Sequence, residues 1–379
     1  MSAWLNSDSG ATTRARTRTR AHTRVQRGAE FALLTLVPLI AALVVGALIM
    51  WALGAHPLEF YADVLRFGLS GNAWQQTLIA MAPLLLIALG LIVSFRAGLW
   101  NLSYTGTYLL AAAVVAGIAP GVTAALPFGL AVTTLIAASV AVGAGIGLIP
   151  AWLKNRNGAN EVVSSLMVSF VAMGLASLLV RGPFQDPAVT VPQTRVLGLE
   201  SMLPFLPGTS VHAGFAISLV VLILAHYLLT RTPFGLRVDL LGANPKAARH
   251  AGVNTKRLTL AVFALSGAAF ALAATVDMLG LWGYMRADFN PTYGDLILPF
   301  VFLARLNPLG SVPFVAFFAV FSTGGTLAAQ RAGLSVDVLL VIVALVLFFM
   351  VLTEYFARRR ATGLSYLPGI AGARGRDDH

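Results

Sequence analysis

Cysteine is absent from this chain of 379 residues, and charged residues make up only 11% of it. Without cysteine there can be no disulfide, thiolate nucleophile or cysteine-ligated metal site. The six histidines never stand three or four residues apart, as a helical pair of metal ligands would. A soluble domain with so few charges could not cover its own surface, and 58% of the residues are hydrophobic. The composition therefore indicates a polytopic membrane protein.

Motifs for catalysis and nucleotide binding are also missing. The sequence contains no GxxxxGK[ST] phosphate-binding loop, no HExxH zinc motif and no GxSxG nucleophile elbow. Ionisable residues within the apolar runs are few, which disfavours a proton-coupled carrier, because such carriers depend on buried titratable groups. We therefore expect a conduit that is not an enzyme and takes its energy from elsewhere. The alternative is an ion-coupled secondary transporter of a small polar solute.

Acidic residues are outnumbered by basic ones, and the formal net charge is +11. In a soluble protein this charge would suggest a nucleic acid partner, but in a membrane protein basic residues gather in cytoplasmic loops. We interpret the charge as topology and expect no nucleic acid partner. Residues 1–28 form an Arg/Thr-rich tail whose only acid is Asp8. We predict a disordered cytoplasmic anchor there, with contact to anionic membrane lipid and an organellar transit peptide as the alternatives.

Apolar runs near the 20 residues that a helix needs to cross a bilayer recur about ten times. They are continuously apolar instead of alternating, which argues against membrane β-strands. We predict an all-α transmembrane domain over residues 29–357 and a C-terminal tail over residues 358–379, with both termini cytoplasmic. The predicted spans are 31–53, 73–95, 102–118, 122–153, 161–180, 211–229, 259–282, 296–304, 308–327 and 336–356; the short one at 296–304 is either a crossing, as basic-residue parity favours, or re-entrant.

Polar side chains within the apolar runs point to a transport pathway, because polar groups at membrane depth cost free energy unless they are satisfied. The stretch NLSYTGTY gathers hydrogen-bonding side chains around a glycine, as in a broken helix that lines a cavity, or in an ordinary interfacial turn. Asp277 lies near the outer end of the seventh span, either at the mouth of a pathway or as an interfacial charge. The candidate pathway residues are Asn101, Ser103, Tyr104, Thr107, Tyr108, Asn160, Glu161, Ser164, Ser165 and Asp277.

A long basic loop, residues 237–258, reads RVDLLGANPKAARHAGVNTKRL. Asn244 is a favourable helix cap, Pro245 suits the first helical position, and Gly252 ends the helix. Small alanines on one face would let another protein approach closely; an amphipathic helix resting on lipid headgroups is the alternative. The residues of this predicted docking helix are Gly242, Asn244, Pro245, Ala247, Ala248, Ala251 and Gly252.

Several stretches, in this order along the chain, resemble the permease subunits of bacterial ABC importers for nucleosides and simple sugars. They are FRAGLWNL, NEVVSSLMVSFVA with LVRGPFQDP, TPFGLRVDLLGANPKAARHAGVNTKRL, SGAAFALAATVDMLG and RLNPLG. The resemblance implies a type II-like importer permease in the bacterial inner membrane. It also implies that residues 242–252 form the coupling helix that docks on an ATPase subunit.

The same resemblance implies the partners. ATP and Mg would be bound by the ATPase, so no cofactor is expected in this chain. A second similar permease subunit would pair with it, as a homodimer or a heterodimer. An extracytoplasmic substrate-binding lipoprotein would dock on the outer loops, with residues 181–207 as the expected contact.

The sequence departs from the family pattern in one place. Family members typically read N-[IL]-G-A-E-G-Q where this chain has NLSYTGT, so Thr105 replaces the Glu and Thr107 replaces the Gln. That segment is expected to line the pathway. The resemblance thus predicts the transport class, and the solute remains a nucleoside or a simple sugar.

Overall fold

Helices make up all regular secondary structure of the part of the chain that the structure describes. The structure is a computed structural model that describes residues 36–362, so the predicted tail of residues 1–28 and residues 363–379 of the predicted C-terminal tail lie outside the described residues. Within this range the strand-like contacts are three isolated β-bridges, Gln185–Thr194, Gln193–Arg286 and Phe205–His212. The prediction of an all-α membrane protein is confirmed.

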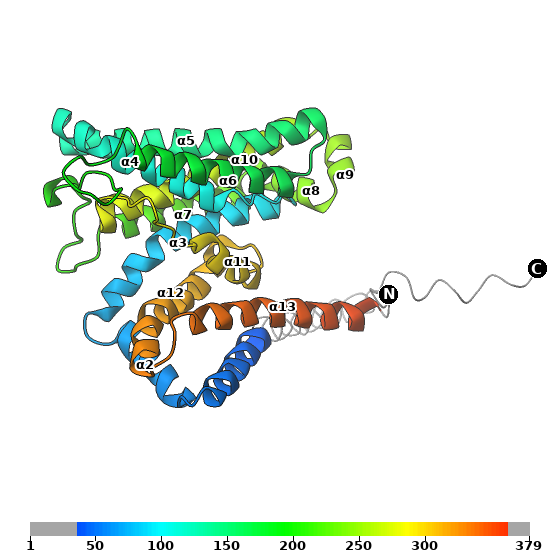
Figure 1. The fold of residues 1–379 in the computed structure, drawn as a ribbon. Helices are drawn as coiled ribbons and strands as arrows, with labels where there is room; N and C mark the ends of the chain where they lie inside the picture. Colours follow the sequence, from blue (N-terminus) through cyan, green and yellow to red (C-terminus); the bar gives the residue numbers. More distant parts are fainter. Residues whose placement is uncertain (1–35, 363–379) are drawn as a thin grey trace, which may run out of the picture. The chain divides into compact units, whose positions relative to one another are not determined.

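The chain divides into two compact units. The smaller one holds the helix Leu36–Ala52 and nearly all of α13 (Val338–Thr362). The larger one, residues 58–339, contains the candidate site (Figure 1). Its helices are α2 (Pro57–Leu69), α3 (Ala73–Arg96), α4 (Tyr104–Ala125), α5 (Phe128–Asn157), α6 (Glu161–Arg181), η1 (Leu199–Ser201), α7 (Gly214–Arg231), α8 (Pro233–Ala243), α9 (Pro245–His250), α10 (Thr255–Asp277), the π-helix η2 (Met278–Trp282), α11 (Tyr293–Leu303) and α12 (Pro308–Arg331).

The number of candidate membrane spans in the described residues can be compared with the predicted count. Seven described helices are long and apolar enough to cross a membrane, or eight if Leu36–Ala52 and α2 form one broken span. The predicted count of about ten is therefore not confirmed. Helix α11 has 11 residues, and at 1.5 Å per residue it covers about 16 Å, roughly half of a 30 Å hydrocarbon core. It cannot cross on its own as an α-helix.

The boundary between α4 and α5 also differs from the prediction. The sequence placed a break near Pro120, but α4 continues through this proline to Ala125, and Pro127 precedes α5 instead. A proline deletes one backbone donor and bends a helix without having to end it. Helix α4 therefore has the length of a full span.

Helix α3 forms the centre of the larger unit. All residues from Met81 to Phe95 are buried, and α3 contacts α7, α10, α11 and α12. A helix that is apolar on every side is stable only when neighbouring helices surround it. Its last residue, Arg96, bonds to Asp239 of α8, and α8 and α9 lie at one end of the bundle (Figure 1).

Helices α5 and α10 pack closely because glycines face each other. A Cβ on Gly143 would lie 2.2 Å from the carbonyl oxygen of Gly267, and a Cβ on Gly267 would lie 2.1 Å from that of Gly143. Small residues of this kind bring helix backbones together in membranes. The contact fixes α10, which carries Asp277, against the long α5.

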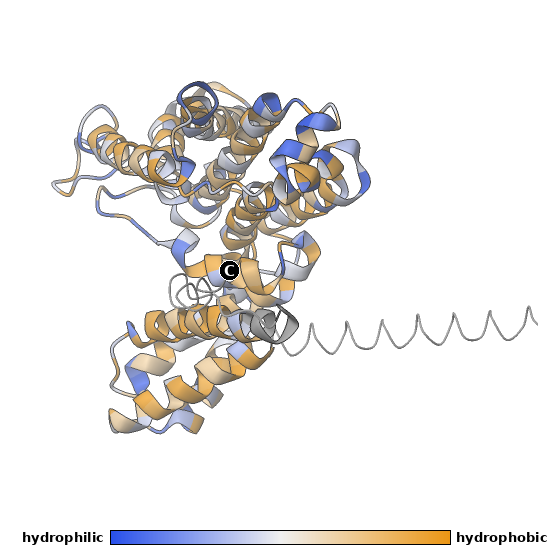
Figure 2. Ribbon diagram, turned by 90° about the vertical axis from the view of Figure 1, so that its right-hand side faces the viewer, coloured by the Kyte–Doolittle hydropathy of each residue, from blue (hydrophilic) through white to orange (hydrophobic). Residues whose placement is uncertain are grey.

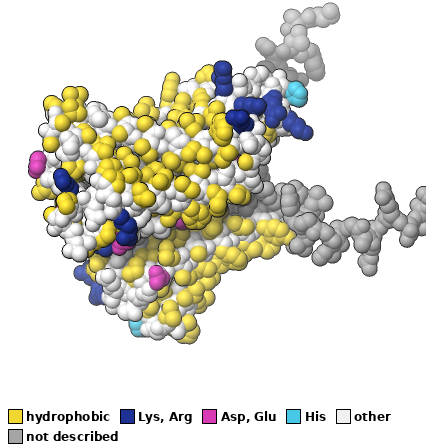
Figure 3. Space-filling view, turned by 45° about the horizontal axis from the view of Figure 1, so that its top comes forward, with side chains coloured by type: hydrophobic (Ala, Val, Ile, Leu, Met, Phe, Trp, Pro, Cys, Tyr) yellow, Lys and Arg dark blue, Asp and Glu magenta, His cyan; other side chains and the backbone are white. Residues whose placement is uncertain are grey.

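The surface of the larger unit has the polarity of a membrane protein. Hydrophobic residues cover the long helices and hydrophilic ones concentrate at their connections (Figure 2). Large apolar side chains such as Phe170 on α6 and Ile223 on α7 are more than half exposed. Lys and Arg side chains gather at the end of the bundle formed by α8 and α9 (Figure 3). Helices α3, α5 and α7 each end in basic residues: Arg96, Lys154, Arg156 and Arg231.

Candidate functional site

The connection between α3 and α4 is a non-helical segment, residues 97–103, in which exposed Gly98 and Trp100 alternate with buried residues. Asn101 and Ser103 are fully buried. The Asn101 amide nitrogen donates to Ser266 Oγ of α10 at 3.1 Å, and its Oδ1 accepts from the backbone nitrogen and hydroxyl of Ser103 at 3.2 and 2.7 Å. Thr107, one turn into α4, donates to Ser103 Oγ at 3.2 Å. The polar segment is thus a buried break whose side chains satisfy one another, as buried polar groups must.

Serines of α6 satisfy the backbone that this break leaves free. Ser165 Oγ accepts from the backbone nitrogen of Leu102 at 3.1 Å and lies 3.3 Å from the carbonyl oxygen of Trp100. One turn further along α6, Ser169 Oγ accepts from the Gly106 backbone nitrogen at 2.9 Å. Ser165 also bonds to its own helix at the Glu161 carbonyl oxygen, 2.6 Å away. Helix α6 therefore holds the start of α4 in place.

Two tyrosines, one turn apart on α4, each donate a hydroxyl to a carboxylate from a distant part of the chain. Tyr104 bonds to Asp295 Oδ1 in the first turn of α11 at 2.5 Å. Tyr108 bonds to Asp277 Oδ2 at the end of α10. The two predicted pathway tyrosines are therefore joined to acidic residues, one of which, Asp277, the sequence also singled out.

Asp277 is 1% exposed, yet its carboxylate is well provided with donors. It accepts from Tyr108, Trp282 and Tyr293. Phe289 lies over the Tyr108 ring with centroids 6.4 Å apart and meets Trp282 edge-on at 5.1 Å. We call these five residues the Asp277 cluster. Aromatic rings exclude water from the carboxylate, and the three donors take the place of its hydration.

Local backbone geometry assembles this cluster. After Asp277 the helix widens into the π-helix Met278–Trp282, which ends at Gly283 with φ +67°. Such π-turns recur at functional sites. Thr292, just before α11, has φ +51°, an uncommon conformation for a threonine that is typical of strained functional segments. The turn returns Tyr293 to Asp277 and places Asp295 beside Tyr104.

Four of these side chains were not predicted from the sequence: Trp282, Phe289, Tyr293 and Asp295. They lie in the stretch WGYMRADFNPTYGD, which combines aromatic rings and acids between two apolar runs. That composition is the signal that would have identified them. Their contacts with α4 join residues far apart in the chain, which no local pattern reveals.

Three predicted pathway residues lie elsewhere, in the α5–α6 connection. Asn160 caps α6 by accepting from the Val162 backbone nitrogen at 2.9 Å. Glu161 forms an ion pair with Lys154 of α5 at 2.7 Å, and Ser164 Oγ bonds to the carbonyl oxygen of Glu161 at 3.4 Å. The structure joins Ser165, and not these three, to the start of α4.

The loop predicted to dock a partner forms two short helices. Asn244 Oδ1 accepts from the backbone nitrogens of Lys246 and Ala247 at 3.0 and 3.2 Å and so caps α9, with Pro245 at its first position. Gly252, with φ +80°, follows the helix.

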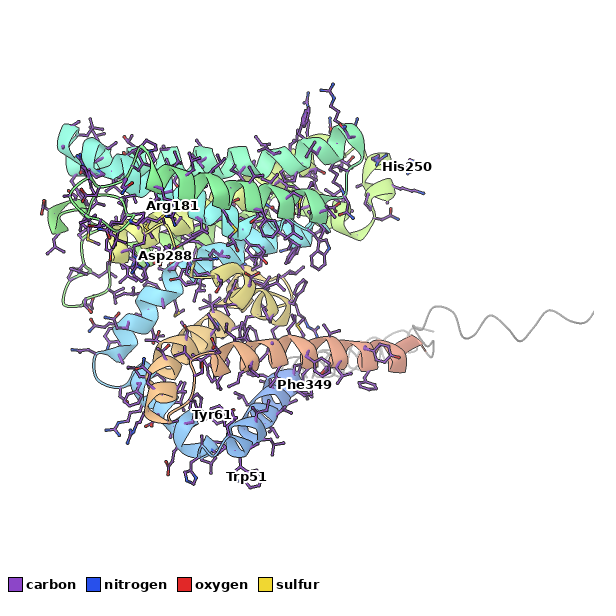
Figure 4. All side chains as sticks on the ribbon, viewed as in Figure 1. Trp51, Tyr61, Arg181, His250, Asp288 and Phe349 are labelled. Atoms are coloured by element: carbon purple, nitrogen blue, oxygen red, sulfur yellow. The ribbon has the colours of Figure 1, made fainter. Side chains whose placement is uncertain are left out.

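One alanine of this predicted docking face is placed differently. Ala247 and Ala251 are exposed, but Ala248 is fully buried against its own chain. The face available to a partner is therefore narrower than the sequence suggested. His250 of α9 and Asp288 lie at opposite ends of the bundle (Figure 4).

His212 lies beside the π-helix, since a Cβ on Gly280 would be 2.4 Å from its Nδ1. Nδ1 accepts from the Gly214 backbone nitrogen at 3.1 Å, and Nε2 has no hydrogen-bond partner among the described residues. Burial lowers the pKa of His212 to about 4, so the ring is neutral near pH 7. No three His, Asp or Glu side chains of residues 36–362 converge as metal ligands.

Comparison with known proteins identifies the family. The family described as "Branched-chain amino acid transport system / permease component" matches residues 73–352. A glucose ABC transporter permease of Haloferax volcanii is 32% identical over 85% of this chain and 87% of its own length. A nucleoside ABC transporter permease of Lactococcus lactis is 25% identical over 83% and 90%, and a guanosine ABC transporter permease of Bacillus subtilis is 24% identical over 83% and 92%. No solved structure matches the chain. The chain therefore belongs to the branched-chain amino acid transport system permease component family, and its relatives named here are ABC transporter permeases.

Proposed function

We propose that the chain is the transmembrane permease subunit of an ATP-driven importer and passes a small polar solute across the cytoplasmic membrane of a bacterium. A separate ATPase subunit binds ATP and Mg and hydrolyses the ATP. A second, similar permease completes the pathway, and an extracytoplasmic binding protein delivers the solute to the outer loops. Membership of a family whose matched relatives are ABC transporter permeases supports this assignment.

The orientation follows from charge. Arg96, Lys154 and Arg231 end their helices at the side of the bundle that carries α9. Basic residues accumulate on the cytoplasmic side of membrane proteins. We therefore assign α9 to the cytoplasm, and the loops around residues 182–213 and 283–292 to the outside. The same rule, applied to the basic residues of 1–28 and 358–360 in the sequence, assigns both chain termini to the cytoplasm.

The observation that carries the proposal is the buried carboxylate of Asp277. An ionisable side chain within a membrane span is costly and is retained mainly at pathways for polar solutes. Here three donors and a ring of aromatic side chains surround it. The carboxylate holds these aromatic side chains in place, and aromatic faces suit a flat or ring-shaped solute.

The solute is accordingly a simple sugar or a nucleoside. The glucose and nucleoside permeases among the relatives support both classes. In this chain the pathway lacks the carboxylate that the family pattern places at position 105. Asp277 and Asp295 each accept the hydroxyl of a tyrosine on the same stretch of α4, and we assign the contact with the solute to Tyr104 and Tyr108.

Affinity purification followed by transport tests the assignment. The tagged chain, purified in mild detergent, is expected to retain an ATPase and a second permease. Right-side-out vesicles that contain the complex, with ATP inside, should take up labelled glucose or guanosine in a way that vanadate stops and a protonophore does not. Uptake that collapses with the protonophore and ignores vanadate would establish the ion-coupled alternative instead.

A further inference from the structure

An ion pair joins α8 to the central helix α3; we call residues 233–250, which hold α8 and α9, the α8–α9 loop. Arg96, the last residue of α3, donates from Nε to Asp239 Oδ1 at 2.5 Å and from Nη2 to Oδ2 at 2.9 Å. Asp239 lies in α8, the helix that precedes α9. Two parallel hydrogen bonds fix the orientation of the two side chains as well as their distance, because the planar guanidinium and the carboxylate must lie in one plane to form both.

The pair is only partly exposed, since the side chains of Arg96 and Asp239 are 22% and 43% exposed. An Arg–carboxylate pair with two parallel bonds in such a position holds its partners in one orientation. It therefore connects α3 and α8 mechanically.

Backbone contact reinforces this connection. A Cβ on Gly242, near the end of α8, would lie 2.2 Å from the Arg96 carbonyl oxygen, and a Cβ on Gly98 would lie 3.2 Å from the Gly242 Cα. The two main chains therefore touch with no side chain between them. Close-packed contacts of this kind transmit displacement instead of absorbing it.

From the Arg96–Asp239 pair, contacts continue toward α9 on one side and toward α4 on the other. Toward the cytoplasm, a single residue, Asn244, separates α8 from α9; its backbone nitrogen bonds to the Leu240 carbonyl oxygen at 3.1 Å and its side chain caps α9. Toward the interior, Gly98 opens the segment in which Asn101 bonds to Ser266 of α10. Helix α4 begins three residues later, with Tyr104 and Tyr108 bonded to Asp295 and Asp277.

We propose that the Arg96–Asp239 pair is the joint that converts movement of α9 into movement of the 97–103 segment and hence of the tyrosines of α4. Arg96 and Asp239 are positioning residues: they touch neither solute nor ATP. This inference rests on the proposed function, in which α9 receives the motion of an ATPase. It adds the side chains through which that motion reaches the solute pathway.

A second ion pair provides a matched control. Arg331 of α12 and Asp63 of α2 lie 3.0 Å apart and also join helices distant in sequence. The Arg331 side chain is 60% exposed, and neither residue belongs to α8, α9 or the 97–103 segment. It is also an Arg–Asp pair, although with one hydrogen bond instead of two, so its loss removes an ion pair between helices without touching the proposed joint.

The first test measures transport with the complete complex in proteoliposomes, with labelled glucose and guanosine as the probes. Arg96→Ala and Asp239→Ala should each lower uptake per ATP hydrolysed at least about fivefold, the lower end of typical coupling energies. The double alanine variant should be no worse than either single one. Arg96→Asp combined with Asp239→Arg should recover part of the loss, and Arg331→Ala should have no effect. Additive losses, no loss, or an equal loss in Arg331→Ala would overturn the proposal.

The second test reports the motion itself and separates the two hypotheses. Because the chain has no cysteine, Trp100→Cys in the 97–103 segment provides a single site for a spin label. With the ATPase bound, ATP and vanadate should change the label's spectrum, and Asp239→Ala should abolish that change. If the label does not respond in the otherwise unchanged chain, the proposed ATP-driven function fails. If it responds equally with and without Asp239→Ala, only the joint is overturned.

Discussion

The Asp277 cluster and the α8–α9 loop are both polar, but they meet opposite physical constraints. In the Asp277 cluster a carboxylate is 1% exposed and depends on donors from α4, the π-helix and α11. In the loop, α9 lies at the surface and its first backbone nitrogens are satisfied by Asn244, directly before it. One region is stabilised by contacts between distant segments, the other by its own cap.

This difference predicts how each region responds to substitution. Removing one partner of a buried polar group leaves the others unsatisfied, which costs far more than the loss of an exposed contact. The exposed face of α9, by contrast, can accept polar side chains without unfolding. Its changes should affect the partner that docks there and leave the fold intact.

The largest expected effect comes from Asp277→Asn. The amide keeps one acceptor oxygen but turns an NH₂ group toward Tyr108, Trp282 or Tyr293, all of which donate. A lost hydrogen bond to a charged group costs about 1.5–3 kcal/mol, equivalent to about 10- to 100-fold. We expect initial uptake of labelled glucose or guanosine into vesicles to fall within that range.

Asp295→Asn is the control for this change, because Asp295 is exposed and bonds to Tyr104 alone among the described partners. Its uptake should fall by less than about threefold, in keeping with an exposed contact. Equal losses in the two variants would show that burial of Asp277 has no special role.

Local chemistry explains what the sequence predicted correctly. Asn244, Pro245 and Gly252 act on residues within three positions of themselves, so the start and end of α9 follow from the sequence alone. The long apolar runs likewise predict α3, α6 and α12 to within a few residues. The buried break at Asn101 could be predicted because polar residues at that depth need partners.

What the sequence could not predict depends on tertiary contacts. Trp282 and Tyr293 reach Asp277 only because a π-helix and a left-handed Thr292 redirect the chain. The burial of Ala248 depends on which side of a six-residue helix meets the bundle, and small residues mark both sides. Helix α11 is apolar like a span but too short to cross alone, and hydropathy does not separate these cases.

Two neighbouring alanines of α9 provide the next largest effect. Ala247→Glu places a charge on the exposed face, so we expect normal amounts of chain in the membrane and about tenfold weaker stimulation of the bound ATPase. Ala248→Glu instead buries a charge and should reduce the amount of folded chain. Quantitative membrane blots and ATPase assays separate the two. Equal folding with equal ATPase loss would place both alanines on the docking surface.

A smaller effect is expected from removing single hydroxyls. Tyr108→Phe deletes one of three donors to Asp277 and keeps the ring against Phe289, so uptake should fall about fivefold, less than for Asp277→Asn because Trp282 and Tyr293 still donate to the carboxylate. Tyr104→Phe frees the exposed Asp295 and should reduce uptake by less than twofold. Competition between glucose and guanosine shows whether either hydroxyl selects the solute. A larger loss in Tyr104→Phe than in Tyr108→Phe would show that Asp295, and not Asp277, is the carboxylate that matters more for transport.

The last substitutions have the smallest expected effect on transport at pH 7. Their effect is on stability in acid, where a buried histidine and an exposed histidine of α9 should differ most. Burial lowers the pKa of His212 from 6.5 to about 4, so the unfolded chain binds this proton more readily than the folded one. The stability that neutral His212 contributes is therefore fully present above pH 6.5 and is lost as the pH drops toward 4. Between pH 7 and pH 5 the loss is about 2 kcal/mol.

His212→Asn keeps an acceptor for the Gly214 backbone nitrogen and should remove most of this acid sensitivity in thermal melts of the detergent-purified chain. His250→Asn, on the exposed α9, should melt like the unmodified protein at both pH values. If all three proteins lose the same stability at pH 5, the acid-sensitive group is not His212.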